Sequence, residues 1–282
     1  MSITEPRVQD SVGTALHFVR SNWRNIAVIA VIGALAATTA QMVGSLAPTL
    51  PFLTVAAVLL LNALIYAVFI GLALRGQPLR FVWAEGVRLF AAMAVIAFFF
   101  CIVGFVLAMV GGIILLAGPY APYLQEVSRA SGDQAAVNQL LMRMWIQNPW
   151  PIVLLCAFYF AAWFYLSTRL YLAAPATIDR GRILTFETWS WTKNAALKIA
   201  GARAMLVGPA FVLSFALTYL IGRAAGVDLF NANTPAPQPA AALAYAIISA
   251  FISYLVSDAI SAGLSTALYR DLGGKNAQLP PR

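Results

Sequence analysis

The side chains that could do acid–base, nucleophilic or metal chemistry are few in this chain. It has 1 histidine, 2 cysteines and 10 Asp and Glu in 282 residues. General acid–base catalysis needs titratable groups that are positioned together, whereas the acids here are mostly isolated. The sequence contains no phosphate-binding glycine loop, nucleophile elbow or HExxH motif. We therefore expect no catalytic residue, no metal site, no cofactor, and a protein that is not an enzyme.

Two charged residues lie inside or at the end of long apolar stretches, where ionisable groups mark either a function or a structural pair. Asp258 lies about 17 residues into the last stretch, which is roughly 25 Å from its outer end at the rise of an α-helix. Arg169 lies at nearly the same depth in the fourth stretch. We expect Arg169 and Asp258 to form a buried pair that holds two hairpins together. A proton or ion relay is the alternative.

The same last stretch carries a serine at every fourth position. Small side chains at this spacing let a neighbouring helix approach closely, so we expect a helix-packing ridge. A hydroxyl-lined water path beside Asp258 is the alternative. The ridge consists of Ser249, Ser253, Ser257, Ser261 and Ser265.

Composition shows what must position these residues. The chain is 61% hydrophobic and only 10% charged, with a mean hydropathy of +0.81. A soluble domain carries about 25% charged residues, so an ordinary soluble protein is excluded. A membrane-spanning helix needs about 20 apolar residues. The sequence therefore predicts an all-α polytopic membrane protein, a single domain over 1–272 with six transmembrane helices near 25–46, 52–74, 89–117, 150–172, 201–222 and 241–268.

The basic residues predict how these helices are oriented, because Lys and Arg are retained on the cytoplasmic side. With the N-terminus inside, only Arg129, Arg143 and Arg223 of the 18 Lys and Arg residues fall outside. Both termini are then cytoplasmic. The net charge of +8 follows from this topology and from attraction to anionic headgroups, so we expect lipid partners and no nucleic acid.

Amphipathic segments with tryptophan and basic residues precede the first, third and fifth predicted spans, near 8–23, 79–90 and 183–198. Such helices lie in the headgroup plane of a bilayer. We expect three units, each an interfacial helix followed by a helical hairpin. The predicted contacts to anionic lipid on the cytoplasmic side are Arg20, Arg24, Arg80, Arg88, Lys193 and Lys198.

The connection 118–149 is long and, in this topology, periplasmic. Its apolar residues recur at helical spacing, which predicts an amphipathic helix that covers the bundle or lies on the outer leaflet. A face that docks a protein partner or a second copy of the chain is the alternative. That face consists of Val137, Leu140, Leu141, Met144 and Trp145. We expect the segment 273–282 to be a mobile tail.

The segment between the fourth and fifth spans resembles a known family. Arg169 ends a span, Pro175 follows, and Asp179 comes four residues later in place of a more usual Glu. The stretch Ser190-Trp191-Thr192-Lys193 is a compressed form of the motif that begins the next interfacial helix. The closing residues 268–272 also fit. These features resemble the bacterial inner-membrane proteins of the YciC type and the membrane domain attached to some glycerophosphodiester phosphodiesterases.

The resemblance implies a multi-pass protein of the bacterial inner membrane, concerned with lipids or with envelope maintenance. The chain has no hydrolase domain, so the attached enzyme's activity is not implied. Our leading hypothesis is a non-catalytic, lipid-interacting scaffold or an accessory subunit of an envelope complex. A small transporter or channel with a polar path near Asp258 and the span-six serines is the alternative. A membrane-embedded lipid enzyme ranks lowest, because no acids or histidines converge.

Overall fold

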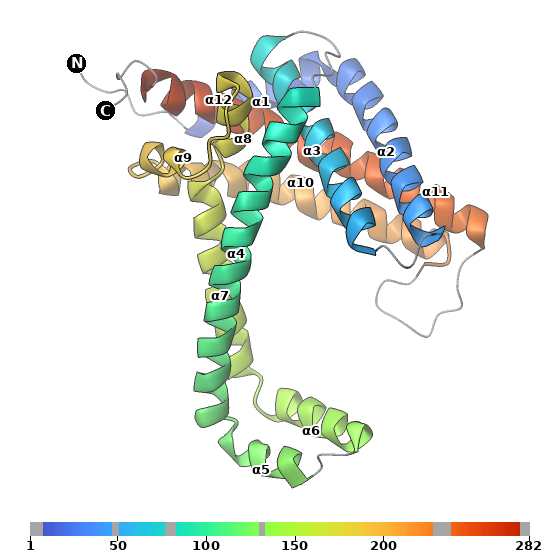
Figure 1. Ribbon diagram of the computed structural model, residues 1–282, viewed down its shortest axis with the longest axis vertical. Helices are drawn as coiled ribbons and strands as arrows, with labels where there is room; N and C mark the ends of the chain where they lie inside the picture. The colour runs from blue at the N-terminus through green and yellow to red at the C-terminus, as the bar shows by residue number, and fades with distance from the viewer. Residues whose placement is uncertain (1–7, 47–50, 77–82, 130–132, 228–237, 277–282) are drawn as a thin grey trace. The chain divides into compact units, whose positions relative to one another are not determined.

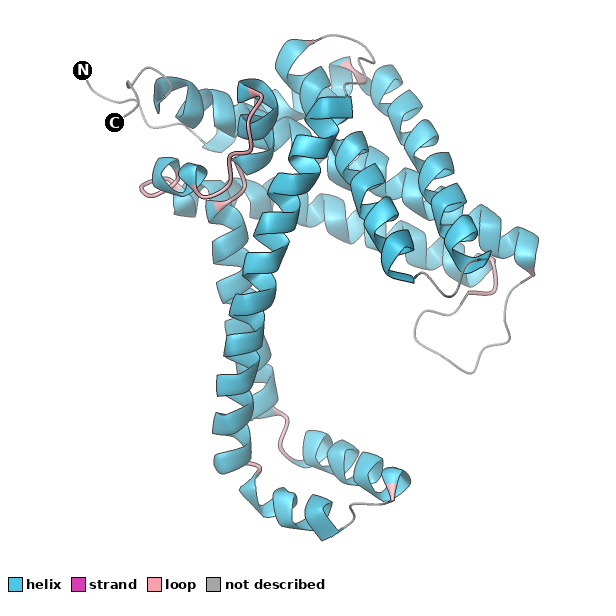
Figure 2. Ribbon diagram, viewed as in Figure 1, coloured by secondary structure: helices cyan, strands magenta, loops and turns pink. Residues whose placement is uncertain are grey.

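The computed structural model describes residues 8–46, 51–76, 83–129, 133–227 and 238–276. Every regular element within these ranges is a helix (Figure 2). Six helical stretches are long and apolar enough to cross a membrane, so the prediction of an all-α polytopic membrane protein is confirmed. The six are Trp23–Gly44, Phe52–Arg75, Trp83–Ala117, Trp150–Arg180, Ala196–Ala224 and Pro239–Leu272.

The chain divides into two compact units, and each is described by itself. The first combines Met1–Val95 with Thr168–Arg282, and the second is Ile96–Ser167.

The first unit is built on the two ends of the chain. Helices α2, α3 and α11 pack side by side, while α1 lies against α12 (Figure 1). The helices of this unit are α1 (Val8–Ser21), α2 (Trp23–Leu46), α3 (Pro51–Arg75), the N-terminal part of α4 (Trp83–Ala117), α8 (Ala173–Arg180), α9 (Glu187–Trp191), α10 (Ala196–Ala224), α11 (Pro239–Ile252), η1 (Ser253–Asp258) and α12 (Ala259–Asn276).

Two clusters of buried apolar side chains hold this unit together. One joins α2, α3 and α12 through residues such as Ile26, Phe69 and Ala262. The other joins α1, α8, α10 and α12 through residues such as Ala15 and Ile199. Because a bilayer gives apolar side chains no hydrophobic reason to leave lipid, close packing of this kind is what holds membrane helices together.

Glycine allows a close approach between α1 and α12. A Cβ placed on Gly263 of α12 would lie 2.8 Å from Cδ1 of Phe18 and 3.4 Å from the carbonyl oxygen of Ala15. Both of those residues belong to α1. A larger residue at position 263 would therefore force Phe18 to shift.

The sixth span is not one continuous α-helix. Between α11 and α12 the chain forms a π-helix, η1, which ends at Asp258. Helices of this kind occur mostly as single wide turns inside α-helices, frequently at functional sites. The sequence predicted an unbroken span over 241–268, because hydropathy does not distinguish one helical hydrogen-bond pattern from another.

The three predicted interfacial helices differ from one another. The first is α1, a separate helix that a turn at Asn22 divides from α2. For the second, the described part is not a separate helix but the beginning of α4 (Trp83–Ala117). Positions 79–82 of that segment lie outside the described residues. The third shortens to α9, five residues long.

The second unit contains the C-terminal part of α4, α5 (Ala121–Arg129), α6 (Gln134–Gln147) and most of α7 (Trp150–Arg169). The hydroxyl of Tyr159 on α7 donates to the carbonyl oxygen of Gly104 on α4 at 3.0 Å. The buried Tyr120 donates to the carbonyl oxygen of Asn148 at 2.6 Å and closes the connection. Helix α6 confirms the predicted helix, whereas α5 was not predicted.

The C-terminal segment is partly helical. Helix α12 continues to Asn276, so the first four residues of the predicted tail extend the last helix. Residues 277–282 lie outside the described part of the chain.

Candidate functional site

The corner between α1 and α2 is a polar hollow of about 390 Å³. We call it the basic corner, and its lining residues are Arg20, Ser21, Asn22, Trp23, Arg24 and Asn25. Asn22 shapes the turn, because its backbone N–H and its Nδ2 both donate to the carbonyl oxygen of Phe18, at 3.0 and 3.1 Å. The backbone N–H of Ile26 then donates to the carbonyl oxygen of Asn22 at 3.0 Å. The chain thus passes from one helix to the next within a single residue.

Two arginines give the basic corner its charge. The side chains of Arg20 and Arg24 are exposed, and neither forms an ion pair with a residue that the structure describes. The guanidinium carbon of Arg24 lies 5.6 Å from the centre of the Trp23 ring. Trp23 is itself 58% exposed, as expected of an aromatic residue at a membrane interface.

This arrangement suits a phosphate group. Guanidinium groups donate hydrogen bonds in a planar fork that matches phosphate oxygens, and the amides of Asn22 and Asn25 add neutral polar groups to the same hollow. Sequence reasoning named Arg20 and Arg24 but missed the two asparagines. Their position, at the boundary between an amphipathic segment and an apolar span, was the signal that could have found them.

The other predicted lipid contacts are not part of this hollow. Arg88 is exposed on α4 and Lys193 is exposed after α9, whereas Lys198 is half-buried on α10. Arg80 lies outside the described residues. Of the predicted lipid contacts that the structure describes, Arg20 and Arg24 therefore share one hollow, and the others lie at separate positions.

The predicted pair between Arg169 and Asp258 is not formed. The buried Arg169 stacks its guanidinium on Trp189, with 4.7 Å from its carbon to the ring centre. One Nη2–H donates to the carbonyl oxygen of the same Trp189 at 2.8 Å. The hydroxyl of Thr192 donates to the carbonyl oxygen of Arg169 at 3.1 Å. The prediction rested on the equal depth of the two residues in their spans. Equal depth does not determine the direction in which each side chain points, so the pair could not be predicted from depth alone.

The serine ridge is not uniform. The hydroxyls of Ser249 and Ser265 donate to carbonyl oxygens of their own helices, each at 3.1 Å, while Ser253 is exposed and Ser257 half-buried. The hydroxyl of Ser261 makes hydrogen bonds to Tyr66 and Tyr171, which belong to other parts of the fold.

Ser261 is the centre of a group of hydroxyls that we call the hydroxyl cluster. Its Oγ lies 3.2 Å from the hydroxyl oxygen of Tyr66 on α3 and 3.1 Å from that of Tyr171, which follows α7. Tyr171 also donates to the carbonyl oxygen of Ser261 at 3.0 Å. Sequence reasoning missed both tyrosines. A tyrosine within an apolar span was the available signal, because a buried phenol needs a hydrogen-bond partner.

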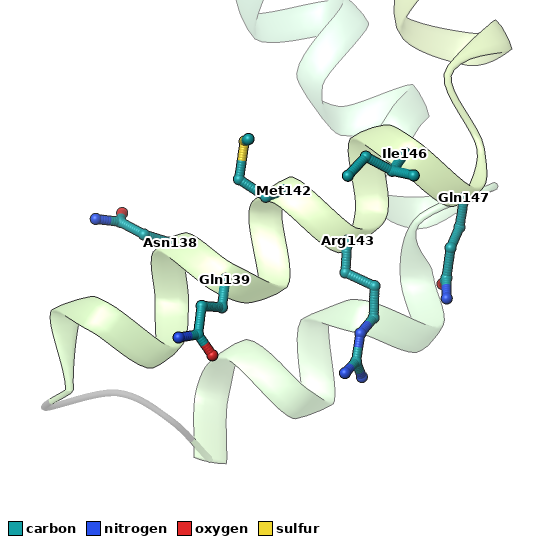
Figure 3. Close-up of a pocket in the computed structure, with 6 residues that line it drawn as sticks. All are labelled: Asn138, Gln139, Met142, Arg143, Ile146 and Gln147. Atoms are coloured by element: carbon teal, nitrogen blue, oxygen red, sulfur yellow. The ribbon is translucent and has the colours of Figure 1, made fainter.

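The predicted partner face on α6 is only partly described. Val137 and Leu140 are half-buried, and the side chains of Leu141, Met144 and Trp145 lie outside the described set. Other residues of α6, namely Asn138, Gln139, Met142, Arg143, Ile146 and Gln147, line an open hollow of about 440 Å³ (Figure 3). This surface mixes amides, one arginine and two apolar side chains, and nothing in it indicates what would cover it.

The described residues contain no group of three or more His, Cys, Asp or Glu side chains that could hold a metal ion. No protein-family model matches the chain, and no curated protein or solved structure matches it either.

Proposed function

We propose that this integral membrane protein binds anionic lipid headgroups at the basic corner, and that it acts as a non-catalytic scaffold or an accessory subunit of an envelope complex. One observation carries the proposal. Two exposed arginines, a tryptophan and two asparagines line a single hollow where an amphipathic helix turns into a membrane span.

Charge supports an anionic ligand. Arg20 and Arg24 have no acidic partner among the described residues, so a lipid phosphate would not compete with an internal carboxylate. Each basic side chain near the surface of an anionic membrane contributes about 1 kcal/mol of attraction. A tryptophan in the same hollow favours a position at headgroup depth.

The proposed orientation places this hollow on the cytoplasmic leaflet, with both chain termini on the same side. The distribution of Lys and Arg along the sequence supports it. The resemblance to YciC-type proteins supports the bacterial inner membrane as the location. Cysteines introduced one at a time at 132 and 193 test the topology, because the two should react with an impermeant reagent from opposite sides.

The lipid test uses the full chain in nanodiscs or in native mass spectrometry, with mixtures of phosphatidylglycerol and phosphatidylcholine. The wild type should retain phosphatidylglycerol preferentially. The double variant Arg20→Gln/Arg24→Gln should lose about 2 kcal/mol of this preference, which is roughly 30-fold in affinity.

A matched control is available in the second unit. Arg129 and Arg143 are exposed and are predicted to lie on the opposite side of the membrane. The double variant Arg129→Gln/Arg143→Gln removes the same charge and should retain the preference of the wild type. Equal lipid selectivity in all three proteins would refute the proposal.

A further inference from the structure

Asp258 is an acidic side chain without a partner inside a membrane-spanning segment. It is the last residue of η1 and lies within the apolar stretch Pro239–Leu272. Its side chain is partly buried, and it forms neither a hydrogen bond nor an ion pair with any residue in the described ranges. An ionised carboxylate in such surroundings costs several kcal/mol unless it is paired or takes up a proton.

The neighbouring arginines do not pair with it. Arg203 on α10 donates from Nη1 to the hydroxyl of Thr168 at 2.8 Å and stacks on the Tyr171 ring, with 4.7 Å from its guanidinium carbon to the ring centre. Arg169 is bound to Trp189. Both arginines are therefore bound to groups other than Asp258.

The other titratable groups near Asp258 are phenols. Tyr66 of α3 and Tyr254 of η1 are the side chains close enough to be influenced by its charge, and neither can supply a positive charge. The helices packed against η1 are α2, α10, α11 and α12. Their described titratable side chains are Arg24 on α2; Lys198, Arg203, Tyr219 and Arg223 on α10; Tyr245 on α11; and Tyr269, Arg270 and Asp271 on α12.

Two further features set this position apart from the rest of the span. The π-helix η1 is the one departure from α-helical geometry in the described part of the sixth span, and Asp258 ends it. One helical turn later, Ser261 joins the hydroxyls of Tyr66 and Tyr171 in the hydroxyl cluster. Hydroxyl groups both donate and accept hydrogen bonds, so polar groups suited to proton exchange lie one helical turn from Asp258 along the chain.

We propose that Asp258 is a proton-binding site within the membrane. Its carboxylate takes up one proton to become a neutral carboxylic acid and releases the same proton when the pH rises. No other atom is transferred, and no oxidant or reductant is needed. This role is independent of lipid binding at the basic corner.

The experiment uses dicyclohexylcarbodiimide, an apolar reagent that reacts with protonated carboxyl groups, on the full chain in nanodiscs. Modified peptides are identified by mass spectrometry. Asp258 should be the most strongly labelled acid, and its labelling should fall several-fold between about pH 6 and about pH 9 as the proton is released. Asp258→Glu should keep the pH-dependent label.

Asp258→Asn should remove the label and, because an amide resembles a neutral carboxylic acid, should leave the thermal unfolding midpoint near that of the wild type at pH 6. The control Glu126→Gln, on the exposed surface of α5, should leave Asp258 labelling unchanged. Absence of label at Asp258 in a folded protein, or label that does not change with pH, would overturn the proposal. Protection by sodium ions at constant pH would also overturn it, because the ligand would then be a metal cation.

Discussion

The hydroxyl of Tyr269 donates to Oδ2 of Asp179 at 2.7 Å and ties the last helix of the chain to α8. Asp179 stands where the resemblance to YciC-type proteins expects an acid. Its neighbour Arg180 stacks on Trp191, with 4.5 Å from the guanidinium carbon to the ring centre. The ring of Trp191 lies 6.3 Å from that of Tyr269. Tyr269 lies 90 residues after Asp179 in the sequence, and these contacts together join α8, α9 and α12.

We predict that Tyr269→Phe destabilises the first unit by about 1–2 kcal/mol, because a hydrogen bond to a charged acceptor is lost and Asp179 loses a partner. The measurement is the midpoint of unfolding in detergent. Tyr245→Phe is the matched control, since the hydroxyl of Tyr245 makes no hydrogen bond to another described residue. Equal effects of the two substitutions would show that the Tyr269–Asp179 bond contributes nothing.

A second prediction tests whether Arg169 and Asp258 interact. Arg169 is bound to Trp189, so the effects of Arg169→Lys and Asp258→Asn on stability should add within about 0.5 kcal/mol in a double-mutant cycle. Arg169→Lys alone should destabilise, because an ammonium group cannot reproduce the planar stacking on Trp189. A coupling energy well above that limit would show that Arg169 and Asp258 do interact, as the sequence predicted.

A third prediction concerns the contact that positions the basic corner. Gly263→Ala would place a methyl group against Phe18 and the Ala15 carbonyl oxygen, so it should destabilise the α1–α12 contact by about 1–3 kcal/mol. It should also weaken retention of phosphatidylglycerol, because α1 carries Arg20. The control is Gly13→Ala on α1, where nothing lies within 4 Å of the added methyl.

A thermal unfolding curve and the lipid assay together decide this third prediction. If Gly263→Ala lost stability but retained phosphatidylglycerol as the wild type does, lipid binding at the basic corner would not depend on the α1–α12 packing. Wild-type stability in Gly263→Ala would show that the two helices can move apart without cost.

Much of the fold was predictable from hydropathy. The six membrane-spanning helices, the separate helix α1 before the first span and the helix α6 within 118–149 all follow from runs and periods of apolar residues. These signals are local. They predicted a separate interfacial helix before the third span, whereas the described part of that segment is the beginning of α4. The short helices α5 and α8 were missed because neither is a long apolar run.

The candidate sites were predictable only in part. Arg20 and Arg24 could be named because basic residues beside a span are typical of headgroup contact. Asn22, Asn25, Tyr66 and Tyr171 were missed, because a single polar residue at a span boundary, or a tyrosine inside a span, does not reveal its neighbours.

The sequence by itself determined that this chain is a membrane protein, how many of its helices are long and apolar enough to cross a bilayer, and which residues are costly to bury there. These properties depend on the transfer of side chains from water to lipid, which each segment expresses independently of the others. The tertiary structure alone decided that Arg169 turns to Trp189, that Ser261 meets two tyrosines and that Asp258 ends a π-helix without a partner. The direction in which a side chain points and the groups that it contacts depend on how the helices pack. The hydropathy of the sequence does not encode that packing.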